Sequence, residues 1–242
     1  MICVVRLKLT LQYDGTRFRG WAAQPNLRTV EGVVRDALGW VYGSWERLSV
    51  AGRTDTGVHA LGQVASVEVE GGPPVDKAPL ALNTALPDDV SVIAAEEADP
   101  DFHARHSAKA RGYRYRIWRR STPSPFEQHR SWWFPHALDD DALADCADLL
   151  IGEHDFRAFT PTETQHQVFR REVREAAWFE RGDALELEIT AGSFLRHMVR
   201  TLVGTMLEKS PEVLAELLEG APRDAAGSTA PAHGLYLERV EY

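Results

Sequence analysis

The chain has 242 residues, of which 44% are hydrophobic and 26% are charged, so the disordered and fibrous classes are excluded and one large or two small domains are expected. The formal net charge of −9 argues against a general attraction to nucleic acid, because phosphate binding needs positive charge. Lysine and arginine nevertheless gather between Lys109 and Arg120, where no acid occurs. An acidic protein with one basic face is still compatible with RNA binding.

The two cysteines, Cys3 and Cys146, form no CxxC pair, so the sequence does not support a zinc or thioredoxin-like site. We expect both to be reduced thiols. The first nine residues lack a signal-peptide pattern, and no apolar stretch approaches the length of a membrane span. The expectation is therefore a cytoplasmic protein that does not contact a membrane.

The first half of the chain predicts the order strand, helix, strand, strand, helix, strand. Alternating residues predict the first strand over 5–13, and Asp14-Gly15 ends it. Apolar residues at helical spacing follow from Val30 to Val41, with Thr29 as the N-cap. The other strands are predicted over 48–51, 63–70 and 90–95, and the other helix over 76–85.

The second half repeats this order of elements without repeating the residues. It begins with a strand over 111–118 and a helix over 139–151, which has its apolar residues on one side. A hairpin follows, with a turn at Arg181-Gly182-Asp183. The predicted elements from the hairpin onward are strands over 168–180 and 184–190, helices over 193–208 and 211–218, and a strand over 235–240.

Each half follows the βαββαβ order of a ferredoxin-like unit. The sequence therefore predicts an α+β protein with an N-terminal half over 1–105 and a C-terminal half over 106–242. We expect the two halves to form a continuous, mainly antiparallel sheet with helices on one side and a central cleft. Ligands favour such junctions.

The loop over 51–60, Ala-Gly-Arg-Thr-Asp-Thr-Gly-Val-His-Ala, is the first candidate for chemistry. It lies between two predicted strands, where a loop can present side chains at a sheet edge. Arg53 and Asp55 stand two residues apart, and Gly52 and Gly57 allow unusual backbone angles on either side. From spacing alone, a turn in which Asp55 caps its own backbone is favoured over a catalytic carboxylate.

The strand over 111–118 is the second candidate. Tyr113 and Tyr115 share one face, whereas Arg114 and Arg116 share the other. Aromatic rings beside guanidinium groups suit base stacking and phosphate contact, which makes Tyr113, Arg114 and Arg116 candidate RNA-binding residues. An ordinary strand with tyrosines in the core and arginines in water explains the pattern equally well.

The helix predicted over 193–208 is the third candidate, because Arg200 flanks its wide apolar stripe. An arginine near a core needs a carboxylate partner, since an unpaired buried charge is costly. A side chain that extends its charge to the rim is an equally good interpretation. The histidines form no metal-binding pattern, and the sequence lacks phosphate-binding, dinucleotide-binding and GxSxG motifs. No metal or cofactor is expected.

Motifs spread over nearly the whole chain resemble one family. They include the loop over 51–60 and, in order, 13–15, 20–21, 24–26, 29–31, 82–83, 86–87, 102–105, 154–156, 194, 197–200 and 230–235. In this order they resemble the TruA family of tRNA pseudouridine synthases, and the loop over 51–60 resembles the signature loop of that family closely.

The resemblance implies that Asp55 is catalytic, that Tyr113 contacts the target base and handles a proton, and that Arg200 pairs with Asp55. Arg53 would fill the gap left by the flipped nucleotide. The implied activity is the isomerisation of uridine to pseudouridine in the tRNA anticodon stem-loop, at positions 38, 39 and 40. The resemblance also implies a homodimer without a cofactor.

The chemistry is consistent with these residue types. The reaction breaks the N1–C1′ bond of uridine and joins C5 to C1′. A carboxylate can attack or deprotonate the sugar and stabilise positive charge at C1′, and the sequence leaves these roles open. Three alternatives remain: an RNA-binding module without activity, a metal-dependent hydrolase that uses the histidines and acids, and a synthase that acts on another RNA.

Overall fold

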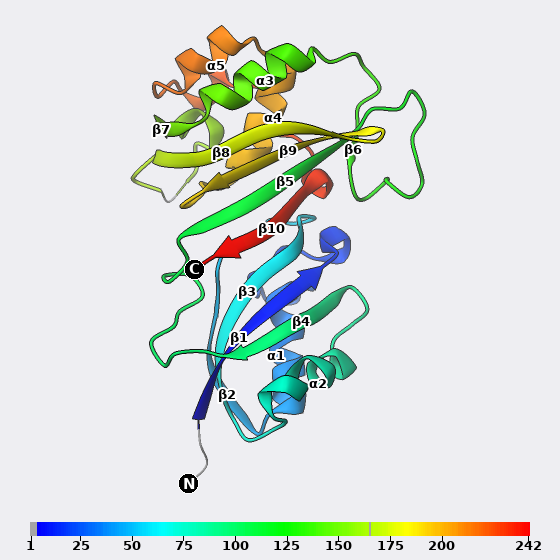
Figure 1. The fold of residues 1–242 in the computed structure, drawn as a ribbon, viewed down its shortest axis with the longest axis vertical. Helices are drawn as coiled ribbons and strands as arrows, with labels where there is room; N and C mark the ends of the chain where they lie inside the picture. Colours follow the sequence, from blue (N-terminus) through cyan, green and yellow to red (C-terminus); the bar gives the residue numbers. More distant parts are fainter. Residues whose placement is uncertain (1–3, 165) are drawn as a thin grey trace. The chain divides into compact units, whose positions relative to one another are not determined.

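The computed structural model describes residues 4–164 and 166–242, which form two compact units (Figure 1). Unit 1 runs to Lys109 and also contains Leu237–Tyr242, whereas unit 2 is Ala110–Tyr236. The predicted boundary places the whole C-terminal strand in the second half. Its last residues join unit 1 because Lys109 N donates to Glu241 O at 2.8 Å and Tyr242 OH donates to Ala104 O at 2.8 Å. Cys3 lies outside the described residues.

Unit 1 has the predicted βαββαβ order. Its elements are β1 (Val4–Tyr13), α1 (Val30–Val41), β2 (Ser44–Val50), β3 (His59–Glu70), α2 (Ala78–Ala85) and β4 (Val90–Glu97), with 3-10 turns at Gly15–Arg17 and Val75–Lys77. The strand order is β4-β1-β3, β2 also pairs with β3, and every one of these pairs is antiparallel. This order places the loop between β2 and β3 at one end of the central strands.

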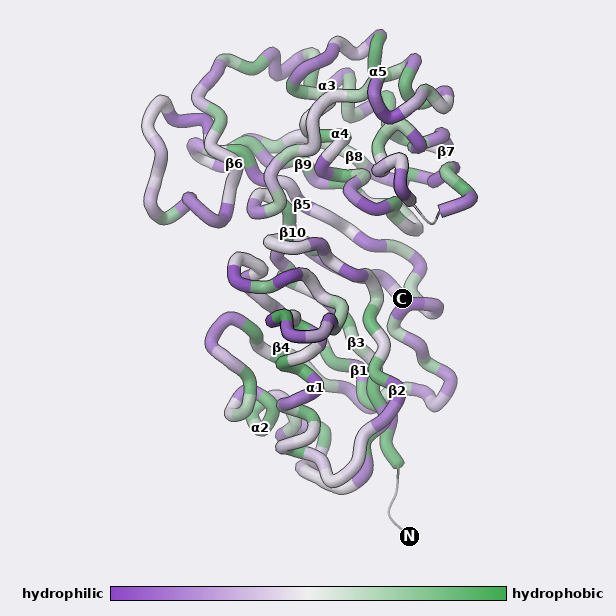
Figure 2. Tube along the Cα trace, turned by 180° about the vertical axis from the view of Figure 1, so that it is seen from behind, coloured by the Kyte–Doolittle hydropathy of each residue, from purple (hydrophilic) through white to green (hydrophobic). Residues whose placement is uncertain are grey.

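The core of unit 1 follows from the alternation in β1. Leu7, Leu9 and Leu11 are each no more than 1% exposed, and Val67 and Ala65 lie across from the first two in β3. Helices α1 and α2 contact each other and cover this apolar face, and Figure 2 shows hydrophobic residues gathered along β1 and β3. Burial of each leucine contributes about 1.5–3 kcal/mol, so these strands form a rigid base for the loop.

Unit 2 contains β5 (Ala110–Trp118), β6 (Trp132–Trp133), α3 (Asp140–Leu149), β7 (Gly152–Asp155), β8 (Arg170–Arg181), β9 (Ala184–Ala191), α4 (Met198–Glu208) and α5 (Pro211–Leu217). Strand β10 (Leu235–Glu241) begins in this unit. The strand order β5-β9-β8-β7 is antiparallel, and β6 pairs parallel to β5. The three helices contact one another, and Cys146 in α3 is 1% exposed. The predicted α+β class with mainly antiparallel sheet is confirmed, and the central cleft stays a prediction.

The helix predicted over 193–208 is wrong at its start. Helix α4 begins at Met198, because the preceding His197 has φ 62°. This left-handed backbone cannot belong to a right-handed helix, although the apolar spacing of the sequence continues through it. The short strands β6 and β7 were not predicted. In the described part of the chain, no helix combines the length and the apolar character that crossing a membrane requires.

Candidate active site

The loop that carries Asp55 connects β2 to β3 in unit 1. Arg53 is exposed, Thr54 is only 7% exposed, and Asp55 is half-buried, so successive side chains point to different surroundings. Of the two glycines that the sequence singled out, Gly57 has a positive φ of 80°, which glycine adopts without strain, whereas Gly52 does not. The loop thus presents a guanidinium and a carboxylate two residues apart.

A buried group of hydrogen bonds holds this loop from below. Tyr13 OH lies 2.7 Å from Thr54 Oγ1, and Gln63 Nε2 donates to Tyr13 OH at 3.2 Å and to Gly52 O at 2.7 Å. Burial raises the pKa of Tyr13 to about 12, despite the opposing effect of its hydrogen bonds to Thr54 and Gln63. The phenol therefore stays neutral and acts as a fixed hydrogen-bonding group.

The segment over 14–28, which follows β1 and is called the bracing segment below, supports the same loop from a second side. Gly15 N donates to His59 Nδ1 at 3.0 Å, and Trp21 N donates to Thr54 O at 3.0 Å. Gly20 has φ +85°, and a Cβ at this position would lie 2.8 Å from Thr54 O. Only glycine allows the two backbones to approach so closely, which gives the Asp-Gly and Gly-Trp motifs of the sequence a physical role.

Helix α1 fixes this bracing segment. Its early backbone groups need partners outside the helix, and Val30 N donates to Gly20 O at 3.2 Å while Glu31 N donates to Trp21 O at 2.9 Å. The predicted N-cap is confirmed, because the Thr29 side chain accepts from Gly32 N. The first turn of α1 is thereby connected through Gly20 and Trp21 to the loop that carries Asp55.

Asp89 anchors the other end of the bracing segment. Arg28 binds its carboxylate with two hydrogen bonds of 2.9 and 2.8 Å, and Arg17 Nε adds one of 3.1 Å. Burial opposes ionisation of Asp89, but the hydrogen bonds and charges of these arginines outweigh it and hold the pKa of Asp89 below its usual range. Asp14 N also donates to Asp89 O at 3.0 Å, which fixes the end of β1.

Tyr113 lies on β5 in unit 2 and is partly buried. Its ring packs edge-on against Phe194, with centroids 4.9 Å apart and an interplanar angle of 80°. The neighbouring Tyr115 is fully buried and donates from its OH to Pro231 O at 2.8 Å. The two tyrosines therefore differ, because Tyr115 belongs to the core and Tyr113 lies nearer the surface.

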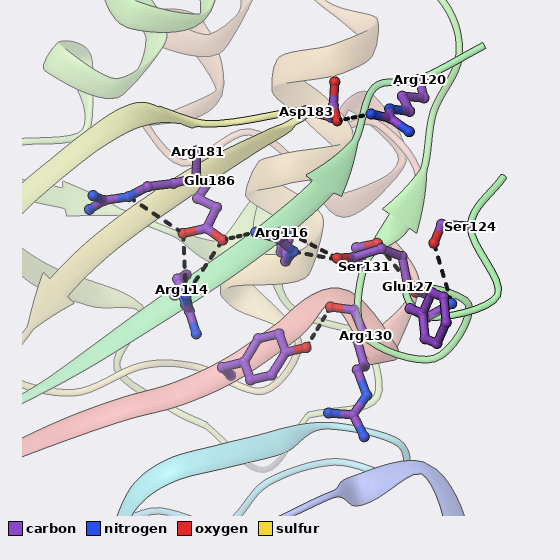
Figure 3. Close-up of polar contacts among 12 residues, drawn as sticks. Arg114, Arg116, Arg120, Ser124, Glu127, Arg130, Ser131, Arg181, Asp183 and Glu186 are labelled. Carbon is purple, nitrogen blue, oxygen red and sulfur yellow. Dashed lines mark hydrogen bonds and ion pairs between the residues drawn. The ribbon is translucent and has the colours of Figure 1, made fainter. Parts of the chain in front are cut away.

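Arg114 and Arg116 lie on the opposite face of β5, as predicted, and both contact Glu186 of β9 (Figure 3). The Glu186 side chain is 2% exposed and also faces Arg181 Nε at 3.9 Å. Arg116 further binds Glu127 with hydrogen bonds of 3.0 and 2.9 Å, and these carboxylates raise its pKa, whereas burial opposes the rise. Arg181 also pairs with Glu188 at 3.3 Å, so three guanidinium groups are matched by three carboxylates.

Arg200 lies in the first turn of α4 and is partly buried. Its Nε donates to Ala230 O at 2.7 Å, and its own carbonyl accepts from Ala230 N at 3.1 Å. The segment that follows is also closely packed, because a Cβ at Gly234 would lie 2.6 Å from Tyr115 Cζ. The residues before β10 therefore orient the Arg200 guanidinium and pack against Tyr115.

The six candidate residues divide between the two units. Unit 1 holds Arg53 and Asp55 on one loop, and unit 2 holds the others, which are Tyr113, Arg114, Arg116 and Arg200. Within unit 2 the structure joins the two strand arginines through one carboxylate. Among the described residues, no group of three or more His, Cys, Asp or Glu side chains could hold a metal ion.

Sequence reasoning missed the residues that support these groups, chiefly Tyr13, Gln63 and Glu186. One signal was present: Gln63 occupies an inward position in a strand whose next inward positions are Ala65 and Val67. A polar residue in an apolar alternation indicates a buried hydrogen-bonding partner. The position of Glu186 opposite Arg116 depends on strand register, which the sequence does not reveal.

Comparison with known proteins identifies the family. The sequence profile of a family described as tRNA pseudouridine synthase matches residues 10–107 and 146–242. The chain is similar to proteins named tRNA pseudouridine synthase A from Bacillus subtilis (strain 168), at 42% identity, and Moorella thermoacetica, at 43%, each over 98% of this chain and 99% of the relative. A protein of that name from Thermus thermophilus is 45% identical over 98% of this chain and 96% of its own length. The chain therefore belongs to the tRNA pseudouridine synthase family, whose members are isomerases.

Proposed function

We propose that this protein converts uridine to pseudouridine in the anticodon stem-loop of tRNA, at positions 38, 39 and 40, with Asp55 as its catalytic carboxylate and without a cofactor. The observation that carries the proposal is the fixed loop in which Arg53 is exposed and Asp55 half-buried two residues later. That loop has the sequence that resembles the signature of the family to which the chain belongs.

Asp55 acts at the sugar in this proposal. The N1–C1′ bond breaks, the uracil turns, and C5 bonds to C1′, after which the C5 proton is removed and N1 is protonated. A carboxylate supports these steps by attacking or deprotonating the sugar and by stabilising positive charge at C1′. Its backbone is already fixed, so little reorganisation is needed as charge develops.

Arg200 and Tyr113 complete the proposed chemistry. A carboxylate in a water-poor site needs a nearby cation to stay ionised, and we assign that role to Arg200. The Ala230 carbonyl holds one side of its guanidinium, which favours a single orientation. Tyr113 contacts the target base and handles the C5 proton, and its packing against Phe194 fixes the ring plane.

Arginine side chains supply the RNA contacts in this proposal. The target uridine must leave its stack at a cost of about a few kcal/mol, and Arg53 fills the space that it vacates. We assign Arg114 and Arg116 to the RNA as well, because β5 combines guanidinium groups with aromatic rings, which suits phosphate contact and base stacking. Such contacts supply affinity that falls with salt.

Assembly and location complete the proposal. We propose a homodimer, as the resemblance implies, and a cytoplasmic enzyme, because that compartment holds the tRNA. Light scattering of the purified protein at several concentrations tests the dimer. A mass of one chain at every concentration would contradict it.

Mapping of modified uridines tests the proposed function. RNA from cells that lack this gene should contain uridine at tRNA positions 38, 39 and 40, and the purified protein should restore pseudouridine there without added cofactor. Pseudouridine lost from another RNA instead would show a different substrate. Unchanged modification in every RNA would contradict the proposal.

A further inference from the structure

The hydrogen bonds beneath the loop connect two core strands to both neighbours of Arg53. Tyr13 ends β1, Gln63 lies in β3, and their partners in the loop are Thr54 Oγ1 and Gly52 O. Tyr13 is 4% exposed, Thr54 7% and Gln63 0%. A buried polar group that loses its partner is left with the cost of its desolvation, so this arrangement resists any other loop conformation.

The orientation of the Gln63 amide is determined by its partners. Nε2 uses its two hydrogens on Tyr13 OH and Gly52 O, while Oε1 accepts from Val64 N at 3.2 Å. With the phenolic oxygen accepting from Gln63, its own hydrogen is available to Thr54 Oγ1. The Thr54 hydroxyl, one residue before Asp55, is therefore directed by a connected network rather than by a single contact.

Backbone hydrogen bonds fix the same residues independently. Trp21 N donates to Thr54 O at 3.0 Å, and Val58 N donates to Asp55 O at 3.1 Å. Gly52, Thr54 and Asp55 are thus each held through a carbonyl oxygen. The network and the backbone contacts together fix the backbone from which the Asp55 side chain extends.

We propose that Tyr13, Thr54 and Gln63 are positioning residues for Asp55, which set the geometry of its carboxylate without contacting the substrate. This inference rests on the proposed function, in which Asp55 acts at the sugar. Misplacement of a reacting group by about 1 Å lowers the rate by about 100-fold, so a network that fixes the adjoining residue has a measurable effect on turnover.

The test compares variants that remove or retain single hydroxyl groups. Tyr13→Phe and Thr54→Val each remove one hydroxyl with little change of shape, and Thr54→Ser keeps the hydroxyl while it loses a methyl group. Tyr242→Phe is the matched control, because it removes a phenolic hydrogen bond, to Ala104 O, that is not part of this network. For each variant, kcat, KM, tRNA affinity and urea unfolding are measured.

We expect Tyr13→Phe and Thr54→Val to lower kcat by about 10- to 100-fold, with KM and tRNA affinity within about twofold of the original protein. Thr54→Ser should recover most of the activity, and Tyr242→Phe should keep it. The double variant with Tyr13→Phe and Thr54→Val should have a kcat no lower than that of the slower single variant, because both substitutions break the same network.

Three outcomes would overturn the inference. Normal kcat in folded Tyr13→Phe would do so, and this isosteric variant decides the matter if Thr54→Val fails to fold. An equal loss in Thr54→Ser and Thr54→Val would show that the hydroxyl is irrelevant. A loss in Tyr242→Phe matching that in Tyr13→Phe would show a general effect of lower stability. Asp55→Ala, assayed in parallel, separates the two proposals, because its normal activity would contradict the proposed function itself.

Discussion

Substitution of Gly20 by alanine tests how the structure positions the loop that carries Asp55. Gly20 has φ +85°, and a left-handed backbone costs an L residue about 1–2 kcal/mol. The new Cβ would also lie 2.8 Å from Thr54 O, a backbone atom that cannot rotate away. Overpacking of this kind costs about 1–3 kcal/mol, so Gly20→Ala should lower the free energy of unfolding by about 2–5 kcal/mol.

Gly71→Ala is a matched control in the same unit. Gly71 has φ +69°, but in the described part of the chain no atom beyond its two sequence neighbours lies within 4 Å of its Cβ position. This variant has the backbone strain without the steric clash, so its free energy of unfolding should fall by about 1–2 kcal/mol. The difference between the two variants, about 1–3 kcal/mol, therefore measures the close approach of Gly20 to the loop.

Urea unfolding and pseudouridine formation are the two assays. Gly20→Ala should lower kcat at least about tenfold, because the loop must shift to admit the methyl group, whereas Gly71→Ala should keep normal turnover. Equal losses of stability in both variants, with normal turnover in each, would refute the reasoning that the segment after β1 braces the loop.

Three further substitutions test the charged groups. Asp89→Asn should lower the free energy of unfolding by about 1–3 kcal/mol at neutral pH, because it weakens the contacts of Arg28. Because the pKa of Asp89 is lowered by folding, its contribution is present above the ordinary aspartate pKa of about 3.9 and is lost as the pH falls through the lowered value, so urea unfolding of the two proteins should converge in acid. Arg116→Met should lower the free energy of unfolding by about 1–3 kcal/mol in the same assay. This is less than the loss from breaking an isolated buried pair, because other guanidinium groups still face Glu186. An unchanged free energy of unfolding would contradict a stabilising role for Arg116. Arg200→Met should lower kcat far more than tRNA affinity, and unchanged turnover would remove Arg200 from the mechanism.

The sequence predicted most of the regular elements because their residues are locally consistent. The alternation of Leu7, Leu9 and Leu11 identified β1, and Thr29 identified the start of α1. In both cases one short segment contains the whole signal. The predicted helix start at residue 193 failed for the opposite reason, since the left-handed His197 interrupts an apolar pattern that continues in the sequence.

The candidate site was only partly accessible to sequence reasoning. The loop sequence identified Arg53 and Asp55, whose roles stay predictions. The hydrogen bonds that support this loop involve Tyr13 and Gln63, which are 50 residues apart in the chain and meet only when β1 and β3 pair. The carboxylate that joins the strand arginines, Glu186, likewise depends on pairing between distant strands. Tertiary contacts of this kind leave little trace in local pattern.

The most direct measurement is the turnover of Asp55→Ala on a tRNA that carries a labelled uridine in its anticodon stem-loop. The variant should fold and bind this tRNA with an affinity close to that of the original protein, because Arg53 and the other cations are retained. It should form no pseudouridine even at enzyme excess and long reaction times. Pseudouridine produced at the normal rate would contradict the assignment of Asp55 as the catalytic carboxylate.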